Sequence, residues 1–170
     1  MRIVSADIAP RQGVQPRDLR NAAGCFTTGV TIVSSGAPGD FHATTVNSFT
    51  SLSLDPPLVV ICLANSSRLR EVIGQSGYFV INILSAEQAS TALTCALKEK
   101  DLSTLETGQT ESGATFLTEN LSTIVCNVDA QHEGGDHTIL VGRVRELIEG
   151  PVGEPLVFFK GQYGTFRATA

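Results

Sequence analysis

The chain has 170 residues, of which 42% are hydrophobic and 17% are charged, values typical of one globular domain. Its 17 acidic and 12 basic residues give a formal net charge of −5, which argues against nucleic-acid binding. No apolar run reaches the length of about 18 residues that a membrane-spanning helix needs, so we expect no membrane insertion. Residues 1–14 lack the basic leader and apolar core of a signal peptide. We therefore expect a flexible N-terminal arm at 1–14, followed by one domain at 15–170.

The four cysteines, Cys25, Cys62, Cys95 and Cys126, are more than 30 residues apart. No Cys-x-x-Cys pair occurs, so the spacing indicates neither a zinc site nor a redox dithiol. Cys62 and Cys126 lie within apolar strand patterns, where a free cysteine behaves as a small core residue. We expect all four to be reduced thiols in a cytoplasmic protein.

In chain order, residues 16–23 have the proline start and apolar spacing of a short helix. Residues 28–34 and 41–47 are rich in β-branched side chains and flank a glycine-rich turn at 36–40, which predicts a hairpin. Residues 98–120 are polar and irregular, and they predict no element. The remaining pattern predicts, in order, a fully buried strand at 58–64, a helix at 68–75 ended by Gly77, a strand at 78–84, a helix from the capping box at 85–88 to about 97, and strands at 122–131, 137–148 and 156–160.

Six or seven strands with hairpin turns and a few inserted helices predict a mainly β fold, a small antiparallel barrel. Neither the glycine fingerprint of a Rossmann fold nor a phosphate-binding P-loop occurs. If the protein binds a nucleotide cofactor, another architecture holds it.

The polar stretch from Thr44 to Pro57 carries many small hydroxyls on backbone that we expect to be extended. Asp55, Pro56 and Pro57 exclude a helix and predict a rigid, extended exit into the next strand. Such a surface suits a flat polar heterocycle, which backbone groups and hydroxyls would hold. A Ser/Thr-rich edge strand without a ligand is the alternative.

Asn65, Ser66 and Ser67 lie between a predicted strand and a predicted helix. Free N–H groups at a helix start favour an anion, and Arg68 or Arg70 could add positive charge. A plain N-cap without a ligand remains the alternative.

Residues 132–137 contain two histidines and two carboxylates. We predict no metal site, because Gly134 and Gly135 indicate a hairpin tip and only His42 could add a further ligand. A hairpin that presents a histidine to a cleft is the better interpretation, and a solvated turn is the alternative.

From about Leu19 to Phe166 the chain resembles the short flavin reductases, which are the reductase components of two-component flavin-dependent monooxygenases. The resemblance rests on five ordered motifs, at residues 26–31, 47–58, 76–84, 135–138 and 155–163. It departs from the family pattern at residues 43–46, where the usual glycine is absent and Val46 precedes Asn47. The choice between FAD and FMN therefore stays open.

The resemblance implies an FMN-binding split β-barrel that works as a homodimer. Residues 45–48 would line the flavin ring, 64–67 would follow the ribityl chain and phosphate, and 135–137 would face the nicotinamide, with His137 as the catalytic candidate. The implied cofactor-binding residues are Thr45, Val46, Asn47, Ser48, Ser53, Ala64, Asn65, Ser66, Ser67, Asp136 and His137.

The implied activity is an NAD(P)H:flavin oxidoreductase, with NADH favoured, that supplies reduced FAD or FMN to a separate monooxygenase. Such an enzyme has to hold the two rings stacked at about 3–3.5 Å, and the cofactors do the chemistry. A flavin-binding storage or sensor protein is the alternative from another class. A split-barrel oxidase acting on a phosphorylated amine would need more arginine than the chain offers.

Overall fold

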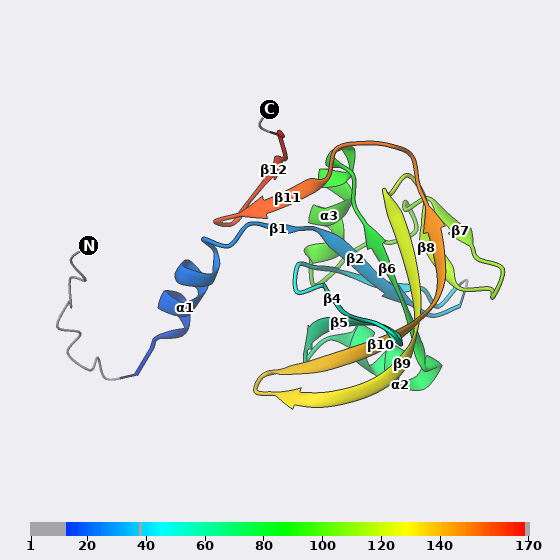
Figure 1. Ribbon diagram of the computed structural model, residues 1–170, viewed down its shortest axis with the longest axis horizontal. Helices are drawn as coiled ribbons and strands as arrows, with labels where there is room; N and C mark the ends of the chain where they lie inside the picture. Colours follow the sequence, from blue (N-terminus) through cyan, green and yellow to red (C-terminus); the bar gives the residue numbers. More distant parts are fainter. Residues whose placement is uncertain (1–12, 38, 169–170) are drawn as a thin grey trace.

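The computed structural model describes residues 13–37 and 39–168 (Figure 1). The predicted arm at 1–14 therefore lies outside the described residues except for its last two, and the domain boundary stays a prediction. The elements are α1 (Pro16–Ala23), β1 (Thr28–Gly29), β2 (Thr31–Ser35), β3 (His42–Val46), β4 (Thr50–Leu54), β5 (Pro57–Ala64), α2 (Arg68–Ser76), β6 (Tyr78–Ile83), the 3-10 turn η1 (Ala86–Gln88), α3 (Ala89–Ala96), β7 (Thr107–Gln109), β8 (Thr115–Leu117), β9 (Ser122–Gly134), β10 (His137–Glu149), β11 (Leu156–Phe159) and β12 (Gln162–Thr165).

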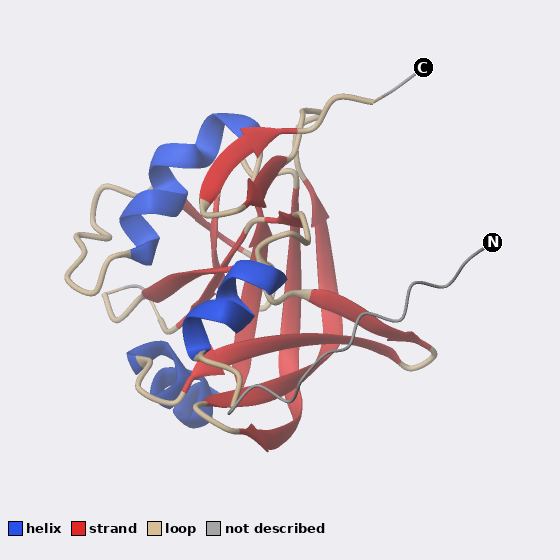
Figure 2. Cartoon of the chain, turned by 90° about the vertical axis from the view of Figure 1, so that its left-hand side faces the viewer, coloured by secondary structure: helices blue, strands red, loops and turns tan. Residues whose placement is uncertain are grey.

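Seven antiparallel strands form the principal sheet, in the order β3-β2-β6-β9-β10-β5-β4. The predicted mainly β fold with inserted helices is thus confirmed. The sheet curls strongly, with α2 and α3 at its opposite ends (Figures 1 and 2). It does not close by strand pairing, because β3 and β4 remain its two edges. None of the helices in the described part of the chain is long and apolar enough to cross a membrane.

The structure differs from the predictions for two strands and for one connection between strands. The strand expected at 28–34 divides at Val30, because β1 pairs with β11 whereas β2 joins the principal sheet. The strand expected to be fully buried at 58–64 alternates instead, since one face of β5 enters the core and the other stays partly open. The extended exit expected at 55–57 is a tight turn that places Leu54 opposite Pro57.

Two short pairings fall where the sequence predicted no strand. The hairpin of β7 and β8 lies within residues 98–120, and β12 follows β11 in a small sheet with β1. These strands have three or four residues each, too few for an alternating pattern to identify.

Helices α2 and α3 cover different sides of strand β2. Val33 packs in a cluster that includes Ile73 of α2, and Ile32 packs in a second cluster that includes Ala92 of α3. Every residue of β2 is therefore buried, although its serines and threonine are polar. This double cover fixes the start of α2 and the end of α3 against neighbouring strand β3.

The long β9–β10 hairpin is anchored near its tip by Asn65, which follows β5. The Asn65 side chain donates to the Gly135 carbonyl (3.1 Å) and accepts from the Thr138 hydroxyl (2.8 Å). Its backbone N–H donates to the Asp136 carbonyl (2.9 Å). The tip is thereby held against the end of β5.

Replacing Asn65 with alanine should loosen the tip without unfolding the sheet. Two side-chain hydrogen bonds are lost, each contributing about 0.5–1.5 kcal/mol. Hydrogen–deuterium exchange should rise at residues 134–138 and stay unchanged in β2 and β6. Thr138→Val, which removes one of the two bonds, should have a smaller effect. Equal exchange in Asn65→Ala and the parent protein would contradict this anchoring role.

Candidate functional site

A pocket of about 330 Å³ lies between the end of β3 and the end of β5. Its size falls within the range of about 300–1,000 Å³ that is usual for small-molecule sites. It is lined by Thr44, Thr45, Val46, Asn47, Ser48, Cys62, Leu63, Ala64, Ser67 and His137. Seven of these ten residues are among those the sequence proposed for cofactor binding.

Ser48 joins the two walls of this pocket. Its hydroxyl accepts a hydrogen bond from the Cys62 N–H (2.9 Å) and donates one to the Cys62 carbonyl (3.1 Å). The Ser48 hydroxyl thus makes both of the hydrogen bonds that a neighbouring strand would otherwise make to Cys62 of β5. The chain after β3 is therefore held beside β5, while the edge of β3 itself remains without a strand partner.

The side chains of β3 are mostly engaged within the protein. The Thr45 hydroxyl donates to the Ala92 carbonyl in α3 (2.6 Å), and Val46 packs in the core with 7% of its surface exposed. The buried Thr31 hydroxyl already donates to the Val46 carbonyl (2.7 Å). The Ala43 carbonyl of β3 also accepts a hydrogen bond, from Lys100 (3.0 Å). What β3 offers to a ligand is the remaining backbone N–H and C=O groups along its unpaired edge, which suit the ring edge of a polar heterocycle.

The start of α2 is the polar end of the pocket. Ser67 occupies the N-cap position, but its hydroxyl makes no capping hydrogen bond. The first-turn N–H groups of a helix lack intrahelical partners, and the helix dipole favours negative charge there. The half-buried Ser67 hydroxyl and these N–H groups form an arrangement that suits a phosphate.

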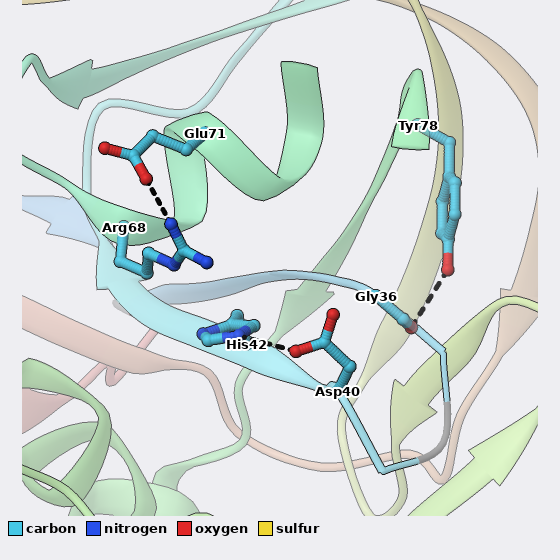
Figure 3. A network of polar contacts seen from close by, with 6 residues as sticks. All are labelled: Gly36, Asp40, His42, Arg68, Glu71 and Tyr78. Atoms are coloured by element: carbon cyan, nitrogen blue, oxygen red, sulfur yellow. Dashed lines mark hydrogen bonds and ion pairs between the residues drawn. The ribbon is translucent and has the colours of Figure 1, made fainter. Parts of the chain in front are cut away.

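The nearby basic side chains are already engaged within the protein. Arg68 pairs with Glu71, and His42 lies 3.1 Å from Asp40 (Figure 3). Arg70 donates from Nε to the Asn65 carbonyl (3.3 Å), which ties α2 to the segment before it. The two arginines that the sequence suggested for an anion therefore also have structural contacts.

His137 closes the pocket from the β10 side, opposite Ala64 in the strand register. Its Nδ1 lies 2.7 Å from Asp136 Oδ1, which orients the ring. The hydrogen bond with His137, and secondarily its charge, lowers the pKa of the Asp136 carboxyl below the ordinary value. The imidazole remains about half exposed, with 46% of its side-chain surface accessible, so it can contact a second molecule in the pocket.

Four proposed binding residues do not line this pocket. Ser66 lines an adjoining cavity, Asn65 anchors the hairpin, and Asp136 contacts His137. Ser53 lies in β4 opposite Leu58, with no described contact to the pocket. Its hydroxyl resembled those of 44–51 in the sequence, but the turn after residue 46 carries β4 to the far edge of the sheet.

Three pocket residues were not among the proposed ones: Thr44, Cys62 and Leu63. Cys62 lies two positions before Ala64 in β5, so the alternation of a strand places both on one face. That signal was present in the sequence.

Within the described ranges, no group of three or more histidine, cysteine or acidic side chains could hold a metal ion.

The comparisons with known proteins agree on one family. The flavin reductase like domain matches residues 23–167. The reductase subunit HsaB of a flavin-dependent monooxygenase from Rhodococcus jostii is 37% identical over 156 residues, which are 89% of this chain and 78% of the relative. The FMN reductase (NADH) SmoA from Agrobacterium fabrum is 37% identical over 154 residues, 91% of this chain and 88% of the relative.

A solved structure shares both the fold and the sequence pattern. The Streptomyces globisporus NADH:FAD oxidoreductase SgcE6, in complex with NAD and FAD fragments, superposes with a TM-score of 0.85 and 33% identity. The match covers 94% of this chain and 99% of that one. With this relative matched over 99% of its length and a domain match over residues 23–167, the chain belongs to the flavin reductase-like family.

Proposed function

We propose that this chain is an NAD(P)H-dependent flavin reductase, with NADH as the favoured donor, that supplies reduced flavin to a separate monooxygenase. The observation that carries the proposal is the pocket itself, where the open edge of β3, the start of α2 and His137 meet. Relatives are named as the reductase subunit of a monooxygenase and as reductases of either FMN or FAD, so both flavins remain candidates.

In this proposal the chemistry is hydride transfer from the nicotinamide to the flavin, which the two bound molecules supply themselves. The protein positions them. The β3 edge holds the ring system, Ser66, Ser67 and the start of α2 bind the phosphate, and His137 holds the nicotinamide. The Asp136 carboxylate and the Asn65 anchor fix the imidazole, because they limit the motion of the hairpin tip.

Weak retention of the product suits this role. The site uses backbone groups, a few hydroxyls and a half-exposed histidine, and the Thr45 and Ser48 hydroxyls are already bonded to the protein. A reduced flavin bound in this way can leave for the oxygenase. A storage or sensor protein would have no use for a histidine at the mouth of the flavin pocket.

We also propose a cytoplasmic location, in keeping with four free cysteines.

The direct test is NADH and NADPH oxidation by the purified protein with FAD, FMN or riboflavin in excess. We expect turnover with NADH that depends on added flavin and is unaffected by EDTA, because no step requires a metal. Absence of turnover with every flavin would refute the reductase assignment. Inhibition by EDTA that zinc reverses would instead revive a metal site involving His132 and His137.

The double change Ser66→Ala, Ser67→Ala should weaken FMN binding and leave riboflavin binding nearly unchanged. Each lost hydroxyl contact to a charged phosphate costs about 1.5–3 kcal/mol, and riboflavin lacks the phosphate. Flavin fluorescence titrations measure both affinities. If riboflavin binding fell equally, the change would have damaged the start of α2 and the phosphate assignment would fail.

His137→Ala should raise KM for NADH and lower kcat moderately, with flavin affinity close to that of the parent. A poorly held nicotinamide loses the geometry for transfer, whereas the flavin contacts β3 and α2 instead. His132→Ala, on the exposed part of the preceding strand, is the matched control and should behave as the parent protein. Unchanged NADH kinetics combined with lost flavin binding would place His137 in the flavin site.

We infer, finally, that the working form is a homodimer. Helix α1 buries none of its residues, and Phe26 after it is 76% exposed (Figure 1). Both border a cavity of about 720 Å³ that also reaches Asn47 of the flavin pocket. A second copy seated there would cover this apolar surface and complete the wall beside Asn47.

Light scattering on the eluted protein should therefore give the mass of a dimer. Phe26→Glu should shift it towards monomer and weaken flavin binding, because a charge in the interface is costly and the wall beside Asn47 is lost. Val152→Glu places a charge on a fully exposed apolar residue in another loop and should leave the dimer intact. A monomeric parent protein would refute the inference.

A further inference from the structure

A larger cavity of about 920 Å³ adjoins the flavin pocket at the start of α2. The two spaces share Thr44 and Ser67 in their linings, so they lie side by side. The larger cavity lies between the first residues of β3, the start of α2 and the segment 96–102 after α3. If the flavin phosphate lies at Ser66 and Ser67, as the proposed function requires, FMN ends where this cavity begins.

The basic groups around the cavity differ in their pairing. Arg68 forms an ion pair with Glu71, and His42 is hydrogen-bonded to Asp40 (Figure 3). Lys98 and Lys100 also line the cavity, and neither makes an ion pair with any carboxylate in the described part of the chain. Lys98 is exposed to solvent, whereas Lys100 is half-buried. Lys100 is thus the half-buried one of two lysines without an ion pair, on a wall that also carries the exposed Glu99.

Two carbonyl groups fix the position of the Lys100 ammonium. Its Nζ donates to the Ala43 carbonyl in β3 (3.0 Å) and to the Cys95 carbonyl at the end of α3 (2.5 Å). An ammonium has three N–H donors, so one remains for a ligand. Burial lowers the pKa of Lys100 from its ordinary value, which reflects the cost of holding the charge away from water. A bound anion would offset that cost.

We propose that Lys100 binds the second phosphate of a dinucleotide flavin, and that the protein accordingly prefers FAD to FMN. This inference rests on the proposed function and specifies its flavin. Phe41 and Leu102 line both this cavity and the next one, of about 560 Å³. They offer apolar surface to the adenine ring, which FMN lacks.

The test compares flavin affinities of the parent protein and Lys100→Gln, measured by fluorescence titration without NADH. Glutamine keeps two N–H donors for the two carbonyls and removes the charge. The parent should bind FAD about tenfold more tightly than FMN, and the change should raise the Kd for FAD about tenfold while FMN and riboflavin stay within about twofold. Lys98→Gln, the exposed neighbour, should change the Kd for FAD by less than about threefold.

Several outcomes would overturn the proposal. Equal parent affinities for FAD and FMN would mean that the larger cavity binds no second phosphate. Equal weakening of FAD and FMN in Lys100→Gln would assign Lys100 to the phosphate that both flavins share. These binding results are independent of turnover, whereas failure of the proposed function would appear as no NADH oxidation with any flavin.

A second measurement needs no variant and covers the case in which Lys100→Gln does not fold. ADP carries the adenosine and a second phosphate without the flavin ring, so it should displace FAD from the parent protein but displace riboflavin at least about tenfold less effectively. If ADP displaces neither, or displaces both equally, the dinucleotide subsite is refuted.

Discussion

The free edge of strand β3 is the constraint on which the rest of the site depends. A fully closed barrel would pair every strand and leave no backbone groups for a ligand. Here the Ser48 hydroxyl takes the hydrogen bonds of Cys62 that a strand would otherwise take, so the chain after β3 reaches β5 without completing a ladder. The gap that remains between the two strands is the pocket. The Ser48 side chain holds the two walls of the pocket together, and the groups that β3 offers to a ligand belong to the backbone.

The positions of the helices follow from the same sheet. Because β2 is buried on both sides, one side has to be covered by α2 and the other by α3. Covering the first side brings the start of α2 to the end of the pocket. Covering the second brings the end of α3, and with it the Cys95 carbonyl that holds Lys100, to the other side of β3. Packing of the core thus places a helix start and a lysine along one groove.

The sequence predicted the elements with strong local signals well, and long-range placement poorly. The bounds of α1 were predicted correctly, and Gly77 ends α2 in the left-handed conformation (φ 73°) that glycine adopts readily. Ser53 and Thr45 look alike in sequence, yet the sheet order separates them, and no local pattern reveals that order. Seven pocket residues were anticipated chiefly through the family resemblance. The sequence could not reveal that the Thr45 hydroxyl donates to the Ala92 carbonyl, since the two residues are 47 positions apart.

The internal use of these hydroxyls changes what the polar stretch means. Thr44, Thr45 and Ser48 all donate to carbonyls of other elements, so their polarity serves to assemble the walls. A hydroxyl that donates to a carbonyl has no proton left for a ligand, and it keeps only weaker acceptor capacity. Flavin specificity then cannot come from these side chains, and it has to come from the backbone edge at one end of the groove and from charge at the other. A backbone edge treats FMN and FAD alike, because their ring systems are identical. Any discrimination between them is therefore left to the groups beyond the first phosphate.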